Sequence, residues 1–350
     1  MSKLATPRRA LLAVSERFKM RLHRWSTSGG PVRRGLYYSF GSRAFARETS
    51  AVTAGIRTYN DRVDDGFELY QLRRHIHMLE KGLTMQPRRD SFALDYIEST
   101  VSTFRNFPYV PGGAGAEEHD WAASVLDAYF EATATAQAPE IARARENYLS
   151  SRVGREVVEQ GPHEMGDAIS PLAYDQLAQL AHARRSVRWY LPKEVDSGII
   201  DRAVEVALES PTACNRQPYV FYILNDKETV AKAVDIPMGT RGYGHQIPAL
   251  AVIVGDLSAF FDERDRHLIY VDGCLAAMSF VLGLEAQGVS TCCVNWPDIP
   301  EKEQAMAKLL GLEPFQRVVM LVAFGYADPQ GMVPRSIKGP LGDARKYVTL

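Results

Sequence analysis

Hydrophobic and polar positions divide this chain into two parts with different patterns. Up to about residue 169, apolar residues recur three and four positions apart, which places them on one face of a helix. The clearest such stripe is Leu69, Leu72, Ile76 and Leu79. The expected elements are a helix, turn and helix over 61–98, with Gly82 as a stop, and helices over 120–136 and 140–148. This part is therefore predicted to be a mainly helical extension.

From about Tyr174, short apolar runs of strand length alternate with helical patterns. The expected strands cover 219–224, 249–254, 290–295 and 317–324. The expected helices cover 196–208, 227–234, 267–287 and 300–310. Neither G-x-G-x-x-G nor a P-loop occurs, so we expect an α+β fold and not a Rossmann unit. Any phosphate must then be bound by side chains and not by a glycine-rich turn.

Composition adds limits to this prediction. The chain has 350 residues, 46% of them hydrophobic and 24% charged, with a formal net charge of −1. These values are typical of a soluble globular protein and give no general attraction to nucleic acid. Its four cysteines show neither Cys-x-x-Cys nor Cys/His ligand spacing, so we expect free thiols, no metal site and a cytoplasmic location.

The first fifty residues carry eleven lysines and arginines but only Glu16 and Glu48 as acids, with leucine, phenylalanine and tryptophan interleaved. Such a segment either lies on an anionic membrane surface as a peripheral contact or forms a solvated basic tail, and both interpretations stay open. The expected organisation is a basic, partly disordered segment over 1–50, a helical extension over 51–170 and a cofactor-binding domain over 171–350.

Two segments carry candidate chemistry. Arg184-Arg185-Ser186-Val187-Arg188 concentrates three guanidiniums and a hydroxyl, the groups that bind a phosphate. Pro211 to Pro218 places small residues and the amides of Asn215 and Gln217 in a turn, where they can read the polar edge of a flat ring. Together they favour a mononucleotide cofactor, with FMN the best fit. A solvated arginine face and amides that only tie down a loop are the alternatives.

The chain from Tyr174 to its C-terminus resembles the FMN-dependent nitroreductase family. The likeness is carried by four motifs in the family's order. They are Arg184–Arg188, Pro-x-x-x-Asn-x-Gln-Pro at 211–218, Gly288–Trp296, and Phe324-Gly325-Tyr326 followed by Pro334-Arg335 and Lys338-Gly339-Pro340. The resemblance implies a central mixed sheet flanked by helices, FMN as cofactor, NAD(P)H as co-substrate and a homodimer with FMN at the subunit interface.

The resemblance also implies roles for individual residues. Arg184, Arg185 and Ser186 would hold the phosphate and ribityl chain, and Arg335 and Lys338 would close on the phosphate. Arg188 would stabilise the negative charge at the pyrimidine end of the reduced ring, as the one catalytic side chain. Pro211, Thr212 and Asn215, with Gln217 beside them, would come from the second subunit. Cys293, Val294 and Asn295 would run along the ring near its redox-active nitrogen.

The activity that the resemblance implies is hydride transfer from NAD(P)H to the flavin, followed by two-electron reduction of a small electrophilic acceptor. That acceptor is a nitro compound, a quinone or an activated alkene, or the step belongs to a biosynthesis. Tyr243 and His245 lie in a glycine-punctuated loop that either contacts substrate or is a mobile turn. The alternative function is a non-catalytic flavin-binding or scaffold protein that docks on a membrane or a biosynthetic complex.

The extension carries a second likeness. Arg73 to Met85, with Pro87-Arg88-Arg89, resembles an N-terminal region of a subgroup of these proteins, loosely associated with bacterial surface-polysaccharide gene neighbourhoods. His77, Glu80 and Lys81 lie on adjacent turns of one expected helix. They form either a polar cluster over the flavin or a capping and ion-pair network, and both interpretations stay open.

Overall fold

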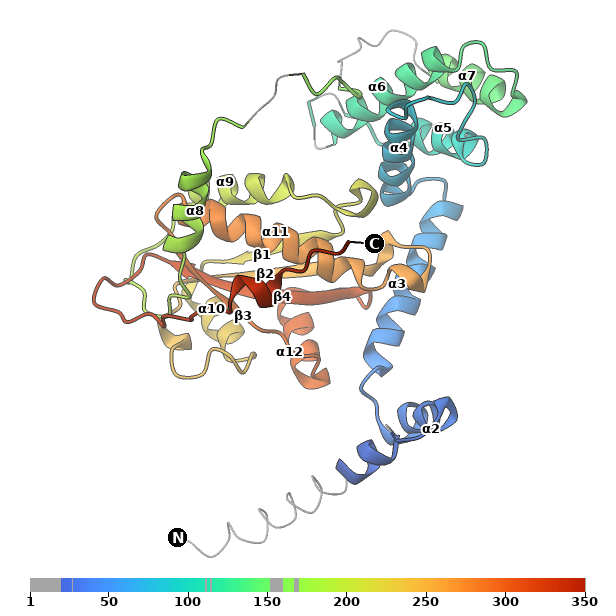
Figure 1. Cartoon of the computed structure of the whole chain (residues 1–350). Helices are drawn as coiled ribbons and strands as arrows, with labels where there is room; N and C mark the ends of the chain where they lie inside the picture. The colour runs from blue at the N-terminus through green and yellow to red at the C-terminus, as the bar shows by residue number, and fades with distance from the viewer. Residues whose placement is uncertain are drawn as a thin grey trace, which may run out of the picture.

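The computed structural model describes residues 20–26, 28–110, 112–113, 115–151, 160–166 and 170–349. Figure 1 shows a body built on a sheet, a bundle of helices at one end of it, and an N-terminal helical arm that stands away from both. Residues 1–19 of the expected basic segment lie outside the described residues.

The body contains a sheet of antiparallel strands. They are β1 (Tyr219–Leu224), β2 (Ala249–Asp256), β3 (Ser290–Val294) and β4 (Gln316–Gly325), in the order β1-β2-β4-β3. All residues of β2 are buried, as expected for a strand covered on both faces. The expected mixed sheet is thus antiparallel in these strands, and the one parallel pairing among the described residues is the bridge between Ser186 and Thr291.

Helices cover both faces of this sheet (Figure 1). One face carries α9 (Ser197–Leu208) and α11 (Leu268–Glu285), and the other carries α10 (Lys227–Val234) and α12 (Pro300–Leu310). Gly283 lets α11 approach α9 closely, because a Cβ there would lie 3.1 Å from the Cα of Ala203. The body also includes α8 (Tyr174–Ala183) and, near the C-terminus, the short α13 (Leu341–Ala344).

The helical extension splits into two parts with different partners. The bundle consists of α4 (Leu69–Leu83), α5 (Ile97–Arg105), α6 (Ala116–Ala132) and α7 (Pro139–Ser151), and it has a core of its own. Leu72, Ile76 and Leu79 of the expected stripe are fully buried in that core. The expected helix, turn and helix over 61–98 is wrong in its last part, because residues 84–96 form no helix and α5 begins only at Ile97. Pro87 stops a helix there, because it lacks an N–H and restricts the residue before it.

The helix before the bundle, α3 (Ala46–Asp64), packs instead on the body, against the short helical turn η4 (Leu257–Ala259). Gly55 makes this possible, because a Cβ there would lie 2.6 Å from the backbone carbonyl of Leu257. α3 runs across the expected boundary between residues 50 and 51, and the domain limits stay a prediction. The arm before it contains a helix over 20–26, α2 (Pro31–Leu36) and the π-helical turn η1 (Tyr37–Gly41).

Among the described residues, one helical stretch, Glu263–Glu285, is long and apolar enough to cross a membrane. Half of its most apolar window is buried inside the body. It includes α11, whose Ala276, Phe280 and Leu284 are fully buried against the sheet. The apolar composition of this stretch is therefore accounted for by its place as a core helix.

Candidate active site

The expected phosphate residues meet around one cavity of about 650 Å³, here called the cationic pocket. Its lining includes Arg184, Arg185 and Ser186 from the segment after α8, and Arg335 and Lys338 from the C-terminal segment. These two stretches lie about 150 residues apart in sequence. Four cationic side chains and a hydroxyl therefore surround a space that has the charge a phosphate group requires and ample room for it.

Two features set the electrostatics of the cationic pocket. Arg185 is held by its own segment, since its Nη1 donates to the carbonyls of His182 and of Arg184, the latter at 3.0 Å. Burial raises the pKa of Glu285 at the end of α11, although Arg184 and Arg185 act to lower it. Glu285 Oε2 is buried and has no hydrogen-bond partner among the described residues. With one nearby carboxyl and four cations, the pocket keeps a net positive charge.

Arg188 is half-buried beside this pocket. Its Nη1 donates to the carbonyl of Ser186 at 3.4 Å, and its guanidinium lies 5.7 Å from the ring centroid of Tyr243. Tyr243 itself is a core residue with 7% of its surface exposed, and its hydroxyl lies 3.8 Å from Cys292 Sγ. Burial raises the pKa of Tyr243 to about 12. Tyr243 therefore packs under Arg188 and is not an open substrate contact, whereas His245 is exposed.

The strand expected to pass the ring alternates between core and surface. Cys293 and Asn295 are exposed at the edge of the sheet, while Cys292 and Val294 are buried. Val294 can therefore offer a ligand only its backbone. Although Cys293 reaches the surface, the protein around it partly desolvates the thiol and raises its pKa, so this thiol is not activated as a thiolate.

The turn over residues 211–217, here called the amide turn, is fixed by hydrogen bonds from several directions. Asp272 Oδ2 accepts from the backbone N–H of Ala213 at 3.0 Å, and Thr212 Oγ1 accepts from that of Gln217 at 3.1 Å. The side-chain amide of Gln217 donates to Asn215 Oδ1 at 3.2 Å. Pro211 is exposed and the other expected contacts, Thr212, Asn215 and Gln217, are partly exposed, so all four are accessible to a ligand.

The backbone of the amide turn is strained. Cys214, Asn215 and Gln217 have φ values of 56°, 53° and 53°, in the left-handed region that side chains other than that of glycine rarely adopt. Such conformations persist where the surroundings hold them in place, and they concentrate at functional sites. The residue types alone do not indicate this strain, because none of these residues is glycine.

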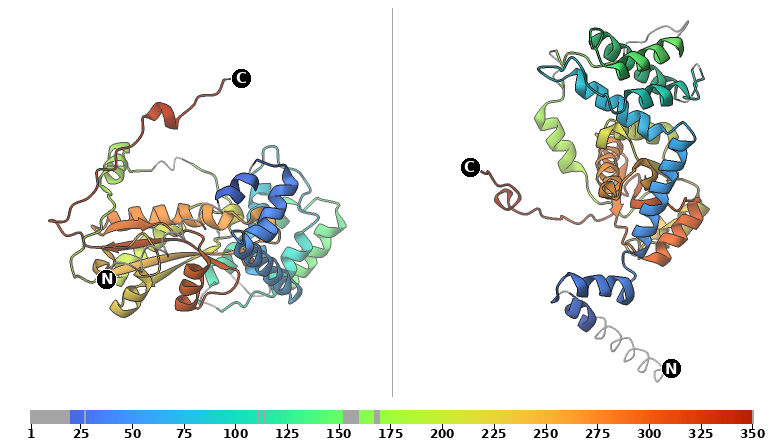
Figure 2. Two further views of the ribbon diagram at one scale, coloured as in Figure 1. Left: turned by 90° about the horizontal axis from the view of Figure 1, so that it is seen from below. Right: turned by 90° about the vertical axis from the view of Figure 1, so that its right-hand side faces the viewer.

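Within one chain, the amide turn and the cationic pocket lie at opposite ends of α11. Figure 1 shows α8, which precedes the arginines of the pocket, near one end of α11, and α4, which contacts the amide turn, near the other end; Figure 2 gives two further views. The turn is tied to Asp272 near the first turn of α11, and the arginines of the pocket act on Glu285 at its last residue. Thirteen residues of helix between these two acids correspond to about 20 Å. The two groups therefore line separate cavities in the single chain.

The helical extension contacts the amide turn directly, which the sequence did not reveal. Arg73 Nη1 of α4 donates to the carbonyl of Arg216 at 3.0 Å, and its other nitrogens form a forked ion pair with Glu118 of α6. The one available signal was that Arg73 opens the second motif.

Within the single chain, two of the three polar residues of that motif take part in an ion-pair and hydrogen-bond network of the bundle. His77 Nδ1 lies 3.5 Å from Glu80 Oε2, and Glu80 Oε1 accepts from Trp121 Nε1 at 2.9 Å, whereas Lys81 is exposed.

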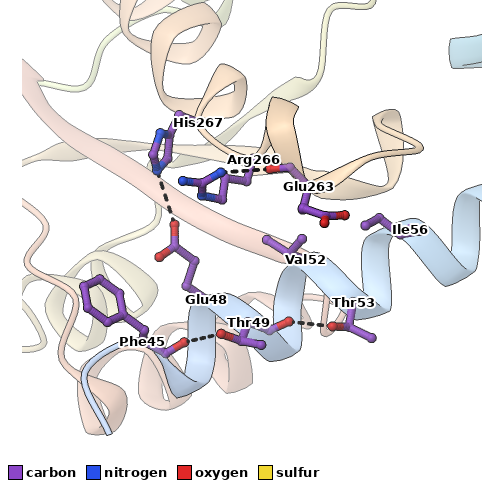
Figure 3. A pocket seen from close by; sticks show the side chains of 9 residues that line it. All are labelled: Phe45, Glu48, Thr49, Val52, Thr53, Ile56, Glu263, Arg266 and His267. Atoms are coloured by element: carbon purple, nitrogen blue, oxygen red, sulfur yellow. Dashed lines mark hydrogen bonds and ion pairs between the residues drawn. The ribbon is translucent and has the colours of Figure 1, made fainter. Parts of the chain in front are cut away.

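A further cavity of about 650 Å³ lies between α3 and residues 263–267 and contains none of the expected site residues (Figure 3). Glu48 Oε1 crosses it to within 3.7 Å of His267 Nε2. Among the described residues, no group of three or more His, Cys, Asp or Glu side chains is placed to hold a metal ion.

A family model described as the nitroreductase family matches residues 181–240 and 236–326. Residues 181–326 of this chain are thus similar to the nitroreductase family along one continuous segment. This match confirms the expected α+β, nitroreductase-like fold preceded by a helical extension, and the chain is an oxidoreductase. The matched residues include Arg184 to Arg188 and the amide turn, but not Arg335 and Lys338.

The individual relatives of this chain are distant in sequence. The chain is 26% identical over 179 residues to an NADH dehydrogenase of Thermus thermophilus, covering 42% of this chain and 85% of the relative. It is 21% identical over 189 residues to an iodotyrosine deiodinase of Hydra vulgaris, and this match covers 46% of this chain and 69% of the relative. A solved FMN-dependent nitroreductase of Clostridium difficile is 20% identical and covers 45% of this chain and 91% of that structure, with a TM-score of 0.39.

Proposed function

We propose that this chain is an FMN-dependent NAD(P)H oxidoreductase. The observation that carries the proposal is the cationic pocket, which gathers Arg184, Arg185, Ser186, Arg335 and Lys338 around one cavity. A phosphomonoester with two negative charges fits this donor set, since arginine and lysine form strong charge-assisted hydrogen bonds with phosphate oxygens. Relatives named NADH dehydrogenase support NAD(P)H as the reductant.

When bound, FMN would supply a ring that takes a hydride from NAD(P)H and passes two electrons to an acceptor. For a nitro acceptor the balance is ArNO₂ + NAD(P)H + H⁺ → ArNO + NAD(P)⁺ + H₂O. The protein's part is binding, orientation and charge. Arg188, half-buried next to the pocket, would hold the negative charge that reduction places at the pyrimidine end. The acceptor is a nitro compound, a quinone or an activated alkene, or an intermediate of surface-polysaccharide biosynthesis.

We propose a homodimer, which the exposed surface of α11 supports. Val271, Leu275 and Met278 recur at helical spacing and are 52%, 45% and 45% exposed, so they form an uncovered apolar stripe between the two ends of the helix. A two-fold axis through this stripe would pair the α11 helices antiparallel and bring the amide turn of one subunit to the cationic pocket of the other. We propose that FMN is bound between these two groups.

The phosphate assignment is tested by comparing FMN with riboflavin, which lacks the phosphate. Lys338→Met should raise the Kd for FMN about 10- to 150-fold, because a charge-assisted hydrogen bond contributes about 1.5–3 kcal/mol. The Kd for riboflavin should not change. Arg202→Met is the control, since Arg202 lies on α9 and donates to Gln287 at 2.9 Å, away from the pocket. Equal losses for both flavins would contradict the proposal.

Catalysis is separated from a flavin-binding scaffold by anaerobic stopped-flow mixing with NADH and with NADPH. Rapid bleaching of the bound flavin supports the enzyme, and bleaching no faster than that of free FMN supports the scaffold. Arg188→Ala should slow this reduction about 100-fold while it weakens FMN binding much less. Equal effects on both would refute the role of Arg188.

We also propose that the N-terminal arm makes a peripheral contact with an anionic membrane. Residues 20–47 contain six arginines and no aspartate or glutamate. Val32 and Phe40 are 74% and 87% exposed, and the Arg33 guanidinium lies 5.5 Å from the Trp25 ring centroid. Exposed aromatic and basic groups together favour the headgroup region of anionic lipids. Flotation with phosphatidylserine vesicles should recover the protein, and Phe40→Ser should reduce recovery. Equal recovery with neutral vesicles would contradict the charge argument.

A further inference from the structure

A cavity of about 400 Å³ lies where the helical extension meets the amide turn. It is here called the junction pocket. Its walls include Arg73, Glu117, Glu118 and Trp121 of the bundle, and Asn215 and Gln217 of the amide turn. A molecule in the junction pocket would therefore touch the two amides that, in the proposed dimer, face the flavin of the partner subunit.

The bundle side of the junction pocket is held rigidly. Arg73 donates through Nε and Nη2 to Glu118 and through Nη1 to the carbonyl of Arg216, so its charge is neutralised and three of its five N–H groups are used. Trp121 is anchored by its Nε1–H, which donates to Glu80 Oε1 at 2.9 Å. The pocket thus has a fixed aromatic wall, which suits a flat ring.

The remaining groups give the junction pocket a net negative charge. Glu117 is exposed and forms no ion pair within the part of the chain that the structure describes. Gln217 donates to Asn215 Oδ1, which leaves Gln217 Oε1 and Asn215 Nδ2 available to a ligand. An aromatic wall next to a carboxylate favours a ring that carries a positive charge, by both cation–π and Coulomb attraction.

We propose that the junction pocket is the acceptor site and that it selects planar acceptors bearing a cationic group, such as a protonated amine, over anionic ones; this rests on the proposed function. The extension of one subunit would then determine the specificity of the flavin bound by its partner. Reduction of the acceptor keeps the balance given above, with NAD(P)H as the electron donor.

The test compares 4-nitrobenzylamine with 4-nitrobenzoate as acceptors for the FMN-loaded protein. The wild-type kcat/KM should be higher for the amine. Glu117→Gln should lower the ratio of the two values at least about fivefold, since one unit charge at contact distance contributes about that factor even in water. Glu131→Gln is the matched control on the same helix, because Glu131 is exposed away from the junction pocket. An unchanged ratio in Glu117→Gln would overturn the proposal.

Binding is measured without turnover. Adding 4-nitrobenzylamine to the oxidised protein, with no NAD(P)H present, should quench a component of tryptophan fluorescence that is missing in Trp121→Phe. Identical quenching in wild type and Trp121→Phe would place the ligand elsewhere and overturn the inference. The proposed function has its own readout, which is bleaching of the flavin by NAD(P)H before any acceptor is added. Normal flavin bleaching without selectivity for the charge of the acceptor would refute only the proposal for the junction pocket. Absence of bleaching would refute the proposed oxidoreductase activity.

Discussion

Replacing Arg73 by methionine should weaken FMN binding although Arg73 lies outside the nitroreductase-family segment. The substitution removes the hydrogen bond from Nη1 to the carbonyl of Arg216, which measures 3.0 Å and is charge-assisted. Such a bond contributes about 1.5–3 kcal/mol. It also leaves Glu118, whose side chain is 19% exposed, without its counter-charge. The methionine keeps most of the apolar stem, so the core of the bundle is not opened.

The size of the effect follows from the strain in the amide turn. Three residues in the left-handed region cost on the order of 1 kcal/mol each. Losing about 2 kcal/mol of support is therefore comparable with the strain that the turn stores, and the turn should leave its binding conformation for much of the time. The corresponding rise in the Kd for FMN is about 30-fold for a loss of 2 kcal/mol, and about 10- to 150-fold over the range of 1.5–3 kcal/mol.

The assay is a titration of FMN fluorescence, accompanied by thermal melting. Arg143→Met is the matched control, because Arg143 joins two bundle helices through Glu98 at 2.6 Å without touching the amide turn. Cys214→Gly added to Arg73→Met should restore part of the affinity, since glycine adopts a φ of 56° without strain. If Arg73→Met binds FMN as tightly as Arg143→Met does, the extension does not hold the turn.

Three further predictions test other parts of the structure. Burial lowers the pKa of His75 from 6.5 to about 4. The stability that neutral His75 provides is therefore complete above pH 6.5 and is lost as the pH falls toward 4. About 2 kcal/mol of the free energy of unfolding should be lost at pH 5, and urea unfolding of the His75→Gln variant should not show this pH dependence. Leu275→Arg should give monomers in sedimentation and lose FMN, because it charges the α11 stripe; a stable dimer would move the interface elsewhere. Gly55→Ala should loosen α3 from the body and raise its protease sensitivity, since the new Cβ would meet the Leu257 backbone at 2.6 Å; unchanged digestion would refute that contact.

The strands of the body could be predicted almost to the residue, and local pattern explains why. Runs such as 249–254 and 318–324 are continuous apolar segments, and the structure buries them in β2 and β4, apart from the partly exposed Met320. The bundle stripe was equally readable, since Leu72, Ile76 and Leu79 occupy one helical face. Prediction failed between residues 84 and 96, where it extended helix into a region whose Pro87 interrupts it.

The sequence predicted separate segments of the candidate site but not how they come together. The sequence identified Arg184 to Ser186 as anion-binding and 211–217 as a turn with usable amides, because both properties belong to short segments. It gave no role to Arg73, Glu118 or Trp121, which meet the amide turn only after two helices have packed. It placed Tyr243 in a loop without showing that the side chain turns inward.

Local sequence was thus enough to predict most helices and strands, the α+β class and the segments suited to bind a phosphate and a flat ring. Each of these properties depends on residues that lie within a few positions of one another. Only the tertiary structure decided that residues 184–186 meet 335–338, that the amide turn lies at the other end of α11, and that the extension contacts this turn. Those outcomes depend on how distant segments dock, and docking is set by the shapes and charges of surfaces that do not exist until the chain has folded.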